Sequence, residues 1–179
     1  MNLPDPLHPA IVHFPIVLLL AGFVLAGLSL WLKKRAMYLA TCIVIGLGAV
    51  GSSVAVSTGE REGESAWIQS EAGEALIDEH EEWAETTQMY AWISFAISLG
   101  VVLLQKYKTP ALIGAGLLCV LMLGTTYCVF QTGHLGGKLV YAYGAGVNPG
   151  QMDASSTGWV KSEKKHEGSK RKTHDDDDD

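Results

Sequence analysis

Two histidines, His8 and His13, lie at the start of the first long apolar run of the chain, in the stretch LHPAIVHFPIVLL. Two others, His80 and His134, lie close to the ends of later apolar runs. Imidazole nitrogen is a common protein ligand of haem iron and of zinc, copper and iron ions. These four residues are therefore the candidates for chemistry, provided that the fold brings some of them together.

Four segments of the chain are long, apolar and almost free of formal charge. The sequence is 48% hydrophobic and only 18% charged, a balance unlike that of a soluble enzyme. A membrane-spanning helix needs about 20 predominantly apolar residues. The sequence therefore predicts an all-α integral membrane protein, a four-helix bundle within a transmembrane domain of residues 1–147. The predicted spans are about 11–32, 36–56, 84–104 and 111–131.

The charges of the connections predict how the bundle lies in the membrane. The first connection, 33–35, is wholly basic, and the third, about 105–110, carries two lysines. The second, about 57–86, holds Arg61 against ten acidic residues. Because basic residues in short loops mark the cytoplasmic side, we expect both termini on the outer, periplasmic side of a bacterial inner (plasma) membrane.

The C-terminal segment, residues 148–179, differs in composition from the rest of the chain. It is polar and charged, and it ends in five aspartates. Such a segment cannot bury enough apolar surface to offset its loss of chain entropy. We therefore predict a disordered charged tail, in which His166 and His174 take no part in a site.

The four candidate histidines are predicted to lie at similar depth. With a rise of about 1.5 Å per residue, His13 lies about 33 Å from the basic connection at 33–35. His80 and His134 lie about 39 Å from the other basic connection, and His8 is at least as far out as His13. All four are therefore expected near the outer interface, on three different helix ends.

Helical phase predicts which way two of these histidines face. Around His80, the less polar positions recur at spacings of three and four residues, which defines one face of a helix. That face holds Ala72, Leu76, His80, Trp83 and Thr87. His80 is thus predicted to face the bundle interior. His13 shares a helix face with Val17 and Leu20, so it is predicted to face inward as well.

The last apolar segment continues into the stretch TGHLGGKLVYAYGAGV, which is rich in glycine. Gly133 is predicted to end the fourth helix by taking a left-handed conformation. The apolar residues 139–147 are too few to span a membrane again, so they are predicted to lie over the outer face as an interfacial segment.

Two imidazoles at matched depth on different helices satisfy the axial coordination of a b-type haem. We predict His13 and His80 as the axial ligands, with His134 as the alternative, while His8 is expected to cap or support the site. Such a protein would carry electrons, alone or as a subunit of a redox complex. The nearby cations that could pair with the haem propionates are Arg61 and Lys138.

Two other interpretations use the same residues. Three or four imidazoles with a carboxylate from Asp78, Glu79 or Glu82 could bind a copper, zinc or iron ion. Alternatively, the histidines hold no cofactor and the protein is a structural or assembly subunit. No nucleophile–base arrangement is visible, so a carrier or subunit is favoured over a free-standing enzyme. The three cysteines form no CxxC pair, which argues against covalent c-type haem.

The run GLGAVG, Gly46 to Gly51, matches the dinucleotide-binding pattern G-x-G-x-x-G. It lies in the middle of a predicted span without a preceding soluble strand, so a nucleotide site is excluded. These glycines, like Gly114 and Gly116, are instead predicted to let helices pack closely.

The two histidine-containing end motifs, with STG before the acidic connection and a His-Glu start to the third helix, resemble the bacterial four-helix membrane family known as domain of unknown function 2231. The resemblance covers about Leu7–Val147, and its matching histidines are the four named above. Members of that family occur fused to, or beside, redox modules such as Rieske-type and cytochrome c domains. The resemblance thus implies electron transfer at the outer face and favours haem over a metal ion.

We expect the electron partner to be a separate protein. Glutamates that flank His80 would present an acidic surface to a basic partner such as a periplasmic cytochrome c. The lipid bilayer is the other expected partner, and no nucleic-acid partner is expected.

Overall fold

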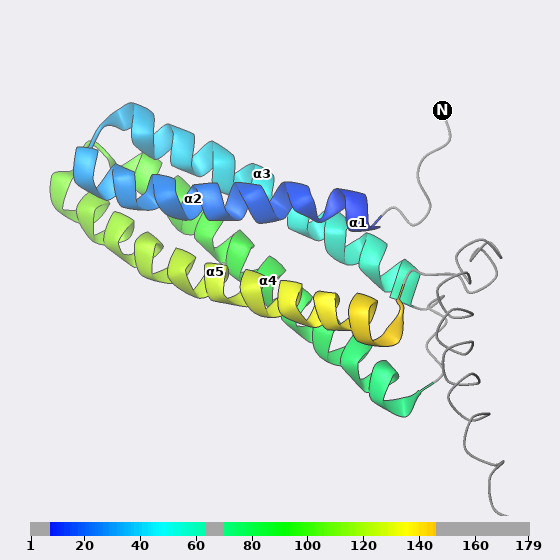
Figure 1. Ribbon diagram of the computed structural model, residues 1–179. Helices are drawn as coiled ribbons and strands as arrows, with labels where there is room; N and C mark the ends of the chain where they lie inside the picture. Colours follow the sequence, from blue (N-terminus) through cyan, green and yellow to red (C-terminus); the bar gives the residue numbers. More distant parts are fainter. Residues whose placement is uncertain (1–7, 64–69, 146–179) are drawn as a thin grey trace, which may run out of the picture. The chain divides into compact units, whose positions relative to one another are not determined.

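The computed structural model describes residues 8–63 and 70–145, and within them the secondary structure is entirely helical (Figure 1). The helices are α1 His8–Ile11, α2 His13–Leu32, α3 Arg35–Gly63, α4 Glu71–Leu104 and α5 Lys108–Tyr143. The predicted all-α architecture is confirmed. The predicted tail, 148–179, lies outside the described residues.

The four long helices form a closed four-helix bundle. Consecutive helices pack against each other, α2 on α3, α3 on α4 and α4 on α5, and α5 completes the ring by packing on α2 (Figure 1). The short α1 packs on α3 and α2. Each of the four long helices is long and apolar enough to cross a membrane, as the sequence predicted.

The bundle interior is lined by small and hydroxyl-bearing side chains as well as by apolar ones. Its fully buried positions include Ala26, Ala49, Ser94, Ser98 and Thr125. Large apolar side chains lie instead on the outside, where Trp31 is 78% exposed and Val120 is 72% exposed. Because lipid solvates apolar groups, membrane helices pack through small residues rather than through large apolar ones.

Two short turns join helices at one end of the bundle. α2 ends where Lys33 takes a left-handed conformation, φ 51°, and donates its backbone N–H to the Ser29 carbonyl at 2.9 Å. This conformation costs a non-glycine residue roughly 1–2 kcal/mol, and it lets α3 begin only two residues later. The turn at 105–107 joins α4 to α5. We call this the basic end; its cations are Lys33, Lys34, Arg35, Lys106 and Lys108.

The opposite end of the bundle gathers α1, the last turns of α3, the first turns of α4 and the last turns of α5 (Figure 1). We call it the histidine end. At this end two helices extend beyond the predicted apolar spans: α3 continues to Gly63 and α4 begins at Glu71. Most of the residues predicted as the second connection, 57–86, are therefore helical. The Ser70 hydroxyl, which accepts the Gly73 N–H at 3.1 Å, caps the start of α4.

The prediction that Gly133 ends the last helix was wrong. α5 passes through this glycine and ends at Tyr143, where Gly144 takes the left-handed conformation, φ 69°. A glycine inside a helix costs only about 1 kcal/mol, and beyond it Leu135 and Leu139 are buried in the bundle. Their packing continues the helix, so the segment predicted to lie over the outer face is mostly the last part of α5.

Close helix packing at glycine is confirmed for part of the predicted set. A Cβ added at Gly46 would lie 2.7 Å from Cε2 of Phe95, and one at Gly114 would lie 2.8 Å from the Val101 side chain. Gly116, by contrast, has open space around it within 4 Å. Its small size is therefore not needed for contacts among the described residues.

The space around each glycine predicts that a change to alanine lowers the stability of the bundle at one position and raises it at another. We expect Gly46→Ala to destabilise the bundle by about 1–3 kcal/mol, because the new methyl group must displace Phe95. Gly100→Ala, on α4 with open space around it, serves as the control and should stabilise the bundle by about 0.5–1 kcal/mol through helix propensity. Thermal unfolding in one detergent checks both, and equal midpoints for the two variants would contradict the close contact.

Candidate cofactor site at the histidine end

His80 lies near the start of α4 and faces α5. The ring is partly buried, and its Nδ1–H donates a hydrogen bond to the backbone carbonyl of Thr132 at 3.0 Å. The edge of the ring lies against Gly136, where an added Cβ would be 3.1 Å from Cε1 of the imidazole. The inward orientation predicted for His80 from helical phase agrees with these contacts.

Two threonine hydroxyls, one from α4 and one from α5, meet near the carbonyl that His80 contacts. Thr132 Oγ1 donates to the Cys128 carbonyl at 2.9 Å and lies 3.2 Å from Oγ1 of Thr87 on α4. Thr87 in turn donates to the Trp83 carbonyl at 2.8 Å. The contact between the two hydroxyls joins α4 to α5 one or two turns from His80, and one of them donates to the other when it gives up its bond within its own helix.

His8 begins α1 and contacts the last turns of α3. Its Nδ1–H donates to the backbone carbonyl of Ala55 at 2.9 Å, and the same nitrogen lies 3.2 Å from Thr58 Oγ1. A Cβ added at Gly59 would lie 3.0 Å from Cε1 of the ring. The sequence assigned His8 only a supporting role, yet the structure docks it on a neighbouring helix in the same manner as His80.

His8 and His80 lie at the same end of the bundle, within range of an electrostatic interaction with each other. His8 docks on α3 and His80 is part of α4, and these two helices pack on each other at this end. A Cβ added at Gly63 of α3 would lie 2.8 Å from Oε1 of Glu81 on α4. The sequence predicted His13, rather than His8, as the partner of His80.

The two rings share one chemical arrangement. In each, Nδ1 donates to a main-chain carbonyl of an adjacent helix, and a carbonyl oxygen can only accept. The neutral ring therefore carries its proton on Nδ1 and its lone pair on Nε2. Metal-bound histidines are usually oriented in this way, with the second ring nitrogen donating to a carbonyl or carboxylate. The pair can thus act as two nitrogen ligands.

His13 does not face inward as predicted. The residue is exposed, and its Nδ1–H donates at 2.7 Å to the Pro9 carbonyl, one turn earlier in the chain. Val17, with which it shares a face, is 63% exposed. Apolar neighbours do not distinguish the interior from the lipid-facing side of a membrane helix. The buried face of α2 is instead marked by Pro15, Leu19, Gly22, Ala26 and Ser29.

His134 and Lys138 lie on another face of α5. His134 is exposed, and with Lys138 and Tyr141 it lines a shallow cleft on the outside of the helix. At about 100° per residue, His134 is turned roughly 200° from Thr132, whose carbonyl holds His80. Neither residue is therefore placed with the pair of imidazoles.

The charged residues of the site surroundings are mostly acidic and exposed. Glu71, Glu74, Asp78, Glu79, Glu82 and Glu85 are exposed on α4. Arg61, the second cation that the sequence singled out, is exposed in the last turn of α3, three residues beyond Thr58. The sequence predicted Arg61 and Lys138 as partners of the haem propionates. Of these two, Arg61 lies on α3, the helix that His8 contacts.

Within 8–63 and 70–145, no three side chains of histidine, cysteine, aspartate or glutamate are placed to hold a metal ion together. The carboxylates considered in the sequence as metal ligands, Asp78, Glu79 and Glu82, are all exposed. The described residues therefore offer a two-imidazole arrangement rather than the three- or four-ligand set of a typical zinc site.

Comparisons with known proteins identify the family. No curated protein and no solved structure matches the chain. A family model described as "Predicted membrane protein (DUF2231)" matches residues 4–149, which include all four long helices and the paired histidines. The chain therefore belongs to this family of predicted membrane proteins.

Proposed function

We propose that this protein binds a b-type haem at the histidine end of the bundle, with His8 and His80 as axial ligands, and passes electrons to or from a partner protein. The observation that carries the proposal is that each of these two imidazoles, at the same end of the bundle, donates to a main-chain carbonyl of a neighbouring helix. The location proposed is the outer face of a bacterial inner membrane, from the charges of the connecting loops.

The donor set fits haem better than it fits a bare metal ion. Two imidazoles from different helices would hold a haem iron, which takes nitrogen ligands of this kind. Zinc requires about four protein ligands at a structural site and about three at a catalytic one, and no such set occurs in the described part of the chain. The haem iron would supply reversible one-electron transfer, while the chain orients the rings and sets their tautomer.

The exposed carboxylates of α4 support an electron partner of opposite charge. Glu79 and Glu82 flank His80 on the outer faces of the helix, and both are exposed. Such a surface steers a basic partner to the cofactor and accelerates encounter more than it strengthens the complex. We therefore propose a soluble basic electron carrier, such as a periplasmic cytochrome c.

The proposal is tested with the detergent-purified protein, reconstituted with haem. We expect about one haem per chain and a Soret band that shifts on reduction with dithionite. Elemental analysis of the same sample separates the alternatives. Stoichiometric copper or zinc without haem would replace the proposal with a metal site, and the absence of haem and metals alike would favour a structural subunit.

A further inference from the structure

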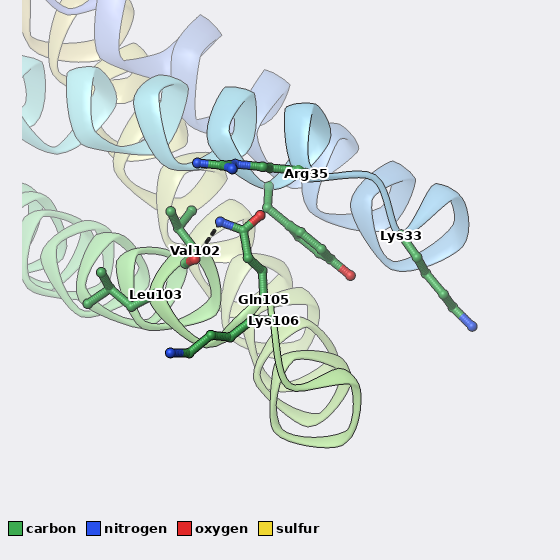
Figure 2. Close-up of a pocket in the computed structure, with 7 residues that line it drawn as sticks. Lys33, Arg35, Val102, Leu103, Gln105 and Lys106 are labelled. Atoms are coloured by element: carbon green, nitrogen blue, oxygen red, sulfur yellow. Dashed lines mark hydrogen bonds between the residues drawn. The ribbon is translucent and has the colours of Figure 1, made fainter.

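The basic end of the bundle contains a cleft, well separated from the histidine end. The cleft has a volume of about 520 Å³ and lies between the start of α3 and the end of α4. Arg35, Tyr38, Gln105 and Lys106 are among its lining residues. In Figure 2, the side chains of Arg35 and Lys106 extend toward the same side, one from each helix, while Lys33 points away from them.

The two helix turns that supply these cations carry no aspartate or glutamate. The sequence contains no aspartate or glutamate between residues 6 and 59 or between residues 86 and 152, which together supply both helix turns of the basic end. Among the described residues, the Lys106 ammonium contacts the neighbouring Tyr107, whose ring centroid is 5.0 Å from Nζ. Two cations that extend toward the same side, from helix turns without carboxylates, favour the binding of an anion.

The residues around the cleft indicate where the anion comes from. Leu103, which lines the cleft, is 68% exposed, and Trp31 and Tyr107 at the same end are 78% and 54% exposed. Large exposed apolar and aromatic residues beside cations are typical of the level where acyl chains meet lipid headgroups. An anion held here would thus be carried by a lipid rather than drawn from bulk water.

Gln105 adds a polar group to the wall of the cleft. Its Nε2 donates to the Val102 carbonyl at 2.6 Å, which fixes the orientation of the amide. Its Oε1 is buried and accepts no hydrogen bond from the described residues. A buried acceptor without a donor is costly, and a hydroxyl or ammonium group of a headgroup is a donor of the required kind.

We propose that the basic cleft binds the headgroup of an anionic phospholipid, with its phosphate between Arg35 and Lys106. Arg35 presents a fork of donors suited to phosphate oxygens, and Lys106 adds a point charge from the opposite helix. A lipid bound there would bridge α3 and α4 where the bundle has only short turns, and would therefore stabilise the fold. The proposal is independent of the haem site.

The test measures the thermal unfolding midpoint of the full-length protein in a neutral detergent as lipid is added. We expect phosphatidylglycerol to raise the midpoint and phosphatidylcholine to leave it nearly unchanged. In the double variant Arg35→Gln, Lys106→Gln, the apparent affinity for phosphatidylglycerol should fall by about tenfold or more, since each cation near a lipid surface contributes about 1 kcal/mol. Inorganic phosphate should not reproduce the stabilisation.

The matched control is the double variant Lys34→Gln, Lys108→Gln. It removes the same charge from the same end of the bundle, but neither residue is among those lining the cleft. We expect it to keep most of the affinity. An equal loss in both double variants would overturn the proposal in favour of diffuse attraction to anionic lipid. Stabilisation by inorganic phosphate at the same concentration would overturn the lipid as the source of the anion.

Discussion

Replacing either His8 or His80 with alanine is expected to lower haem affinity by about a hundredfold or more. Residues that merely orient a metal-bound histidine contribute about tenfold to hundredfold, so loss of the ligand itself should cost at least as much. The measurement is a titration of each purified variant with haem, followed by its Soret absorbance.

The matched controls for this prediction are His13→Ala and His134→Ala. Both residues are exposed at the same end of the protein and neither is placed with the pair. We expect them to retain full haem stoichiometry. Helix content by circular dichroism separates ligand loss from misfolding, and added imidazole should restore part of the spectrum in His80→Ala. Loss of haem in His13→Ala, with His8→Ala unaffected, would show that the sequence-based ligand pair was right.

The second large effect is expected from one methyl group placed beside a ligand ring. In Gly136→Ala the new Cβ would lie 3.1 Å from Cε1 of His80, so the imidazole must shift by a few tenths of an ångström and its bond to the Thr132 carbonyl must lengthen. We expect about tenfold weaker haem binding, in line with the loss of a group that orients a metal-bound histidine. A haem titration against the unchanged protein measures it.

Gly137→Ala is the control for that substitution. It adds the same methyl group one residue later on α5, where no atom of another described residue would lie within 4 Å of the new Cβ. Both variants gain about the same helix propensity, so their difference isolates the contact with His80. If Gly136→Ala and Gly137→Ala bind haem equally well, the ring of His80 is not a ligand held in the observed position.

Much of the fold could be predicted from the sequence, because the signals for it are local. Runs without charge define the four spans, and the acidic stretch before Trp83 already shows a helical period that places His80 inward. The helix ends were harder to predict. A glycine such as Gly133 resembles a stop signal in sequence, and only the burial of Leu135 and Leu139 shows why α5 continues.

The docking of His8 on α3, and the exposure of His13, could not be predicted, for a physical reason. The phase of His13 was judged by apolar neighbours, but a membrane helix is apolar on both its buried and its lipid-facing sides. Small residues such as Gly22 and Ala26 mark the buried face of α2. The small residues Ala55 and Gly59, next to the position where His8 docks on α3, would have been the corresponding signal for that residue.

The most direct test of the paired ligands is electron paramagnetic resonance of the oxidised, haem-loaded protein at low temperature. Two imidazoles on one iron predict a low-spin ferric signal, which His8→Ala and His80→Ala should each convert to a high-spin signal in whatever haem remains. A high-spin signal from the unchanged protein, or a low-spin signal that survives both substitutions, would contradict the assignment of His8 and His80 as the ligands.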